Sequence, residues 1–238
     1  MDLIDRYAEL AVRVGIDLQP GQDLLLIADA ENLAMVRALA EQAYRAGARK
    51  VNVKYRDQHV RKAAIEYGPP DALSTPFDFE LAQYREFIAN GALIQVVGDP
   101  EPHLFDGLDP ARVAAFPVAL GMAMQDLTSR APWLVIGMPT AGWAEEVFGE
   151  PDVDRLWAAV ATATRLDMTD PVGAWRDHIA MLNARGLALD RLAPTAIRFH
   201  GPGTNLTIPM LPGARWLAGT SRTPDGHVFI PNLPTEEV

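Results

Sequence analysis

The chain has 238 residues, 31 of them acidic and 21 basic, so its formal net charge is −10. This balance argues against a nucleic-acid-binding or anionic-membrane surface, because both need clustered basic side chains. Cysteine is absent, which excludes a disulfide framework, a thiolate nucleophile and a thiolate-bound metal. Any bound metal must therefore be held by histidine, carboxylate or carbonyl oxygen. The first residues include Asp2 and Asp5 where a signal peptide would carry basic residues, so we expect a cytoplasmic protein.

Helix and strand patterns alternate through the first 55 residues. Apolar residues recur at helical spacing over residues 3–14 and again over 31–46. A continuous apolar run at 24–28 and an alternating segment at 51–55 predict two strands. We expect Gly15 to end the first helix in the left-handed conformation. A helix between two strands implies a crossover connection and parallel pairing.

The same alternation continues to about residue 188. The spacing predicts further strands at 93–97 and 133–136, and further helices at 78–89, 110–129, 154–164 and 171–185. Pro117 lies inside the second of these helices and predicts a kink or a break there. We therefore predict an α/β fold in residues 1–188, a doubly wound and mostly parallel sheet with flanking helices.

The pattern changes after residue 188. The turn-rich segment between two short apolar runs predicts a hairpin at 197–208, with further short strands at 215–218 and 227–230. We interpret residues 189–238 as the opening strands of a second, β-rich domain, too small to bury much core alone. We expect a piece of a longer protein, whose unpaired strand edges leave Phe229 and Ile230 exposed.

Two histidines follow predicted strands, at the edge of the sheet where open α/β proteins bind ligands. His59 follows Asp57 after the second strand, and His103 follows Asp99 after the third. Together they could form a histidine–aspartate metal site, although solvated loop residues are the more common outcome. The loop 137–143 after the fourth strand could also admit a ligand to backbone N–H groups.

The other histidines carry weaker indications. His178 falls in a predicted helix, where a neighbour could orient it, although a structural histidine is the more common outcome. His200 and His227 lie on predicted hairpin strands, and nothing local marks them as ligands. The first strand is followed by Asp29 and no glycine, which argues against a dinucleotide site there.

Adjacent carboxylates, Glu236 and Glu237, follow a segment bracketed by Pro231 and Pro234. Stiff backbone suits a metal ligand, because coordination geometry must be held tightly. Two glutamates in such a position are also commonly solvated, so both interpretations stay open at this point.

Four segments of the chain resemble the aminopeptidase T / AmpS / PepS family of dinuclear metallo-aminopeptidases. They are Trp-Leu-Val-Ile-Gly-Met-Pro-Thr-Ala-Gly-Trp-Ala at 133–144, Asp-Pro-Val-Gly-Ala-Trp at 170–175, Gly-Pro-Gly-Thr-Asn-Leu at 201–206 and Pro-Asn-Leu-Pro-Thr-Glu-Glu-Val at 231–238. The last segment is the most specific. The resemblance covers the whole chain and departs at Asn205, where the family usually has aspartate, which puts a hairpin hydrogen bond or charge in doubt.

The resemblance implies the N-terminal portion of an enzyme that removes the N-terminal residue from short peptides, using two divalent ions (Zn, Co, Mg or Mn). Only one ligand maps onto this chain, either Glu236 or Glu237. Most other ligands would lie downstream, so we expect the 238 residues alone to be inactive and to hold no metal at His59 or His103. The resemblance also implies a homodimer, in which the α/β domain walls the active-site cleft. The alternative is a stand-alone α/β ligand-binding module that uses the sheet edge near His59, Asp99 and Gly137.

Overall fold

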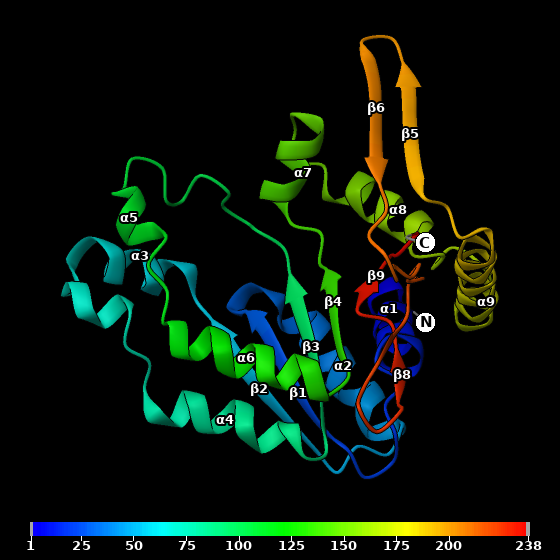
Figure 1. Ribbon diagram of the computed structural model, residues 1–238. Coiled ribbons are helices and arrows are strands. Elements are labelled where there is room, and N and C mark those ends of the chain that lie inside the picture. Colours follow the sequence, from blue (N-terminus) through cyan, green and yellow to red (C-terminus); the bar gives the residue numbers. More distant parts are fainter. Residues whose placement is uncertain (1, 237–238) are drawn as a thin grey trace.

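A five-stranded parallel sheet forms the centre of the protein, described by a computed structural model for residues 2–236 (Figure 1). The strand order is β2–β1–β3–β4–β9, and each neighbouring pair is parallel. The strands are β1 (Asp23–Asp29), β2 (Lys50–Arg56), β3 (Gly91–Val97), β4 (Trp133–Gly137) and β9 (Asn232–Leu233). The predicted α/β class and parallel sheet are confirmed.

Helices cover both faces of the sheet, so it is doubly wound. One face packs against α1 (Leu3–Leu10), α2 (Leu33–Arg45), α8 (Val153–Ala163) and α9 (Pro171–Leu192). The other face packs against α4 (Asp78–Ile88) and α6 (Val118–Arg130). Three further helices lie near the carboxyl edge of the sheet: α3 (Gln58–Tyr67), α5 (Pro110–Val113) and α7 (Ala141–Phe148) (Figure 1).

The continuous apolar run in β1 serves both faces at once. Successive side chains of a strand point to opposite sides. Leu24 and Leu26 accordingly lie in the core under α1 and α2, whereas Leu25 and Ile27 lie in the core under α4 and α6. All seven residues of β1 are buried, as expected for a central strand covered on both faces.

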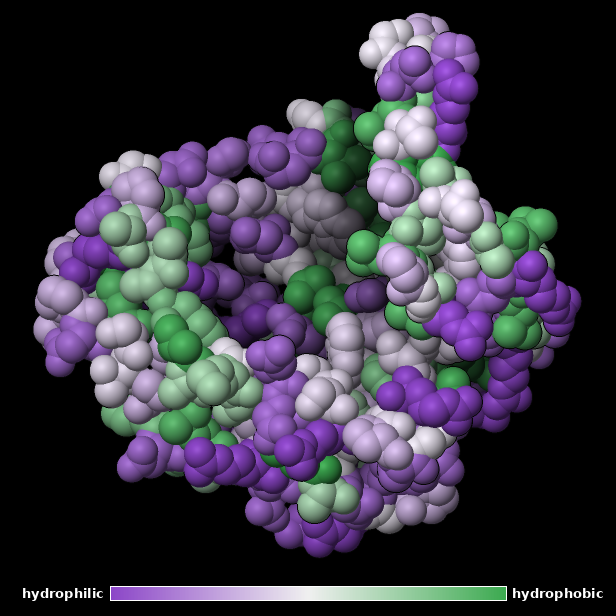
Figure 2. Space-filling view, viewed as in Figure 1, coloured by the Kyte–Doolittle hydropathy of each residue, from purple (hydrophilic) through white to green (hydrophobic). Residues whose placement is uncertain are grey.

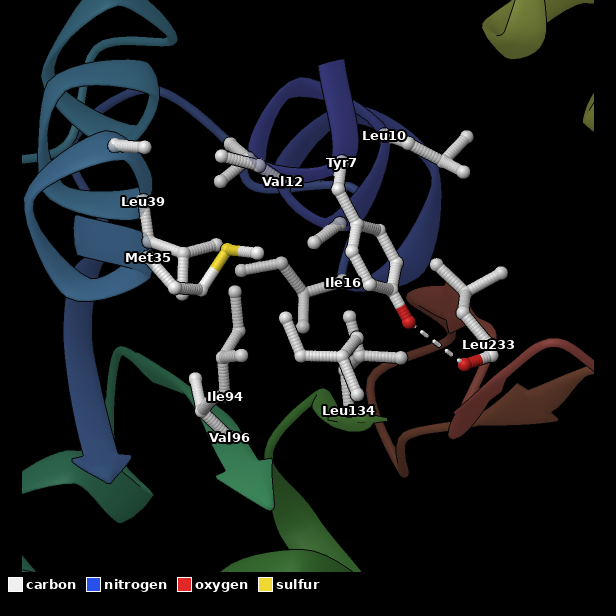
Figure 3. Close-up of a cluster of buried hydrophobic side chains, with 14 of the residues drawn as sticks. Tyr7, Leu10, Val12, Ile16, Met35, Leu39, Ile94, Val96, Leu134 and Leu233 are labelled. Atoms are coloured by element: carbon white, nitrogen blue, oxygen red, sulfur yellow. Dashed lines mark hydrogen bonds between the residues drawn. The ribbon is translucent and has the colours of Figure 1, made fainter. Parts of the chain in front are cut away.

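Tyr7 ties the first helix to the last strand (Figure 3). Its ring is fully buried, and its hydroxyl donates to the carbonyl oxygen of Leu233 at 3.1 Å. Burial raises the pKa of Tyr7 well above its usual range. The hydroxyl therefore keeps its proton, and the contact with β9 persists at any pH near neutrality.

The first helix does not end as predicted. Residues Ala11–Gly15 continue α1 as a π-helix, and Gly15 keeps a helical backbone, so a left-handed Gly15 is wrong. The left-handed residue is Asp17, with φ 45°. Gly15 is needed for space, because a Cβ there would overlap the side chain of Leu134. The carbonyl of Gly15 accepts from the backbone N–H of Ile230 at 2.7 Å.

The C-terminal segment is divided between an exposed hairpin and a buried strand. The predicted hairpin is confirmed as β5 (Ala196–Gly201) and β6 (Thr204–Pro209), whereas residues 215–218 form no strand. Two further short strands, β7 (Ser221–Arg222) and β8 (Val228–Phe229), pair with each other. Phe229 and Ile230 are each only 3% exposed, so their expected exposure is wrong. They are buried because the segment folds back onto the first sheet.

The boundary at 188–189 falls inside α9, which runs to Leu192, and the division into two domains stays a prediction. The break at Pro117 is confirmed, since α5 ends at Val113 and α6 begins at Val118. Two helices, α3 and α7, escaped sequence reasoning. Among the described residues, no helix is both long and apolar enough to cross a bilayer.

Candidate functional site

A cluster of five residues includes the one glutamate of the adjacent pair that the structure describes. This Glu236 cluster consists of Arg165, Trp175, His178, Thr235 and Glu236. Arg165 follows α8, Trp175 and His178 lie on α9, and the last two residues follow β9. Glu237 lies outside the described residues.

The carboxylate of Glu236 contacts two side chains from different helices. Its Oε1 accepts from Nη2 of Arg165 at 3.0 Å, and its Oε2 lies 3.4 Å from Nε2 of His178. The Glu236 side chain is 64% exposed, whereas those of Arg165 and His178 are 23% and 4% exposed. An accessible carboxylate therefore sits over a largely buried base of polar groups.

His178 is oriented from both ring nitrogens. Nη2 of Arg165 lies 3.1 Å from Nδ1, and the carbonyl oxygen of Thr235 lies 3.0 Å from Nε2. A guanidinium can only donate, so Nδ1 must accept. The hydrogen-bond pattern therefore assigns the hydrogen to Nε2, which donates to the backbone one residue before Glu236.

Trp175 is the buried aromatic side chain of the Glu236 cluster. It is fully buried, and its Nε1 donates to the carbonyl oxygen of Thr164 at 2.6 Å. Its ring lies edge-on to His178, with centroids 5.2 Å apart, and the Arg165 guanidinium lies 4.8 Å from a ring centroid. Trp175, the last residue of the motif at 170–175, therefore packs against the side chains of both Arg165 and His178.

The carboxyl edge of the sheet holds the other predicted site residues, but it does not join them into one metal site. His59 Nε2 contacts Glu101 at 2.8 Å, whereas His103 contacts Asp106 at 3.1 Å and Glu146 at 2.9 Å. Asp57 caps α3 by accepting from the backbone N–H groups of His59 and Val60. Asp99 likewise accepts from the backbone N–H of Glu101. Among residues 2–236, no three histidine or acidic side chains are grouped so that they could hold a metal.

Two carboxyl-edge groups have shifted pKa values. Asp106 first, and Glu146 next, raise the pKa of His103 above its usual value. Burial raises the pKa of Asp29, at the end of β1, against the opposing effect of Arg56. The pKa shift of His103 therefore arises from neighbouring carboxylates, whereas that of Asp29 arises from burial.

A cavity of about 410 Å³ opens between the ends of β3 and β4, beside Trp143 and Glu146. Figure 2 shows this face of the molecule hollowed, with the β5–β6 hairpin standing clear of the body. Of the predicted loop 137–143, residues 138–140 are loop, whereas Gly137 ends β4 and residues 141–143 form the first turn of α7, whose N-cap is Thr140. A ligand could approach this edge, but only Asp99 and Glu146 supply charge to the cavity lining.

Sequence reasoning missed Arg165, and it placed His178 in a helix without its partners. No local motif marks Arg165, which meets Glu236 across 71 positions of sequence. Thr140, by contrast, could have signalled α7, because threonine before a helix commonly accepts from the third residue beyond it. It does so here, accepting from the backbone N–H of Trp143 at 3.2 Å.

These features define a parallel α/β protein whose last described residues carry an exposed, oriented carboxylate. The chain belongs to the thermophilic metalloprotease (M29) family, whose model matches residues 1–238. It is 33% identical to Aminopeptidase 2 of Geobacillus stearothermophilus and 35% identical to Aminopeptidase T of Thermus aquaticus, covering 99% of this chain in each case. The solved structure of wild-type AmpT from Thermus thermophilus matches with a TM-score of 0.89 and 33% identity, over 98% of this chain and 60% of that one. The chain spans about 60% of the length of the curated relatives that it matches.

Proposed function

We propose that this chain belongs to a metal-dependent aminopeptidase that hydrolyses the N-terminal residue from short peptides. The observation that carries the proposal is the family match over all 238 residues. Relatives named as aminopeptidases align with nearly the whole chain, and the family match includes the segment that presents Glu236. We propose two divalent ions, drawn from Zn, Co, Mg or Mn.

Within the proposal, one of Glu236 and Glu237 is a metal ligand. Glu236 fits the part of a single ligand, because it is an accessible carboxylate and hard or borderline divalent ions prefer oxygen donors. The described residues do not complete a metal centre, since no three histidine or acidic side chains among them are grouped so that they could hold a metal. The remaining ligands would come from sequence that the relatives have and this chain does not span.

When bound, the ions would polarise the scissile carbonyl and lower the pKa of an attacking water. This chain's own contribution is positional. Glu236 presents its carboxylate at the surface, while Thr235 beneath it is held by His178 at 3.0 Å. The α/β sheet and its helices wall one side of the site.

We also propose a cytoplasmic homodimer. The dimer is supported by several large apolar side chains that are exposed, among them Phe79, Val118 and Met122. Cell fractionation and light scattering after gel filtration would test these two points. A stand-alone ligand-binding module, the alternative, has only the cavity beside Trp143 in its favour.

Substitution of Glu236 tests the proposed function directly. In the protein extended to the length of its relatives, Glu236→Gln should lower affinity for Zn²⁺ and kcat on an aminoacyl anilide at least tenfold, because a neutral amide is a poor metal ligand. The 238-residue chain alone should show no metal-dependent turnover. Glu150→Gln, another exposed acid, is the matched control. Enzyme-like turnover by the 238 residues alone would contradict the ligand assignment.

A further inference from the structure

Arg165 is held in place more firmly than a surface arginine. It has a left-handed backbone, with φ 58°, directly after the C-cap of α8. Its guanidinium lies 4.8 Å from a ring centroid of Trp175, which is itself fully buried. The residue before it, Thr164, is fully buried and accepts from the Trp175 indole. The arginine is therefore fixed at its backbone and at its head group.

The two oxygens of Glu236 have different partners as a result. Oε1 accepts a charge-assisted hydrogen bond from Arg165 at 3.0 Å. Oε2 faces Nε2 of His178 at 3.4 Å, but the single hydrogen on that nitrogen goes to the carbonyl oxygen of Thr235, which is nearer at 3.0 Å. Oε2 thus has no donor of its own among these residues, and it is the open oxygen of the carboxylate.

We propose that Arg165 is a positioning residue, which holds Oε1 of Glu236 so that Oε2 is presented to a divalent cation. The inference rests on the proposed function, in which Glu236 is a metal ligand. Hydrogen-bonded partners behind a metal ligand orient it, and their removal typically lowers metal affinity about 10–100-fold. Through Nδ1 of His178, the same guanidinium also fixes the ring that anchors Thr235.

The charge of Arg165 acts on metal affinity in the opposite direction to positioning. A guanidinium beside a metal ligand repels the cation, so its removal would tighten binding if repulsion dominated. The Arg165 guanidinium contacts three side chains, those of Glu236, His178 and Trp175. Because two of these contacts order the base of the cluster, we expect the loss of orientation to outweigh the relief of repulsion. The sign of the change in affinity therefore distinguishes a positioning residue from a competing counter-ion.

The test measures metal binding by calorimetry with Zn²⁺, and the d–d absorption of bound Co²⁺, in the protein extended to the length of its relatives. Arg165→Ala should weaken Zn²⁺ binding about 10–100-fold and alter the Co²⁺ spectrum. Arg165→Lys should lose less, because it keeps the charge but lacks the fork that reaches both partners. Arg176→Ala, on the exposed side of α9, should change neither readout. Tighter binding in Arg165→Ala would overturn the proposal.

Glu236→Gln distinguishes a failure of the proposed function from a failure of the role proposed for Arg165. Unchanged metal affinity in this variant would remove the proposed ligand and the positioning role together. A loss in Glu236→Gln without a loss in Arg165→Ala would leave the proposed function standing and overturn only the role of Arg165.

A metal-free measurement on the 238-residue chain guards against a variant that fails to fold. Side-chain ¹⁵N shifts of His178 in the unsubstituted protein should report a hydrogen on Nε2 and none on Nδ1. A hydrogen on Nδ1 would show that Arg165 does not donate to this ring, and would contradict the network.

Discussion

Strands β1 and β6 pair with their neighbours over similar lengths but differ in every other respect. All seven residues of β1 are buried, whereas all six residues of β6 are exposed. β1 has a strand on each side and helices over both faces, while β6 has only β5 as a partner. Backbone pairing therefore says little about where stability lies in this protein. The covering of the strand faces decides it, because burial of apolar surface is the main favourable contribution to folding.

The short strand β9 also shows that burial does not follow from length or from position in the sequence. It has two residues and follows the hairpin in sequence, yet it joins β4 in the parallel sheet and buries Leu233 to 3% exposure. Distance along the chain from the sheet does not exclude a segment from the core. What matters is whether the segment finds an uncovered edge or face.

The largest expected effect is the difference in the free energy of unfolding between two leucine substitutions, one in β1 and one in β6. Leu26 of β1 is fully buried, and Leu206 of β6 is 50% exposed. Leu26→Ala should lower the free energy of unfolding by about 2–5 kcal/mol, because it leaves a cavity in the core. Leu206→Ala should change it by about 0.5 kcal/mol or less, as is usual for a surface side chain.

Urea unfolding of both variants would measure this difference. Equal losses in the two variants would show that the hairpin is covered in solution, and the comparison between β1 and β6 would then fail.

A smaller difference in stability is expected between two glycine substitutions. A Cβ on Gly98, just after β3, would overlap the backbone carbonyl oxygen of Met138, whereas Gly201, at the end of β5, has open space around its Cβ position. Gly98→Ala should destabilise by about 1–3 kcal/mol through overpacking. Gly201→Ala should be neutral or stabilise by up to about 1 kcal/mol, because it restricts the unfolded chain without strain. Thermal melts of the pair would measure both changes. A stable Gly98→Ala protein would mean that the carboxyl edge of the sheet yields more easily than its packing indicates.

The smallest effect concerns His103, an exposed group at the carboxyl edge. Its pKa is raised in the folded protein, mainly by Asp106. Because the folded pKa is raised, the stabilising contribution of His103 is present at pH below the ordinary histidine value of about 6.5, and is lost as the pH rises through the higher folded pKa. Asp106→Asn should lower the pKa of His103, whereas Glu145→Gln, on the neighbouring helix, should leave it unchanged.

An NMR titration of His103 would measure these shifts. A pKa for His103 that does not respond to Asp106→Asn would show that the exposed ion pair does not persist in solution.

The parallel sheet could be predicted because local patterns specify it. Residues 24–28 form an apolar run of strand length, residues 93–97 are apolar except for Gln95, and the helices between them have one apolar face each. The break at Pro117 followed from the geometry of proline. These features depend on neighbours in sequence, so the sequence alone reveals them.

The Glu236 cluster could be predicted only in part. The pair of glutamates stood out through its prolines and its family resemblance, but Arg165 and the orientation of His178 did not. Their contacts join positions 71 and 57 apart in sequence, and no local pattern encodes a contact of that range. The place of β9 escaped for the same reason, since its partner β4 lies about a hundred residues earlier.

The hydrogen bond between Tyr7 and Leu233 also has a consequence for the order of events during synthesis. It joins residues 226 positions apart. A ribosome adds roughly 5–20 residues per second, so Tyr7 leaves the ribosome about 10–45 s before Leu233. Leu134 of β4 leaves the ribosome 99 positions before Leu233, so for about 5–20 s at the same rate the edge of β4 that β9 later covers stays open. Chaperones that recognise exposed apolar chain could bind this edge until the final few described residues arrive.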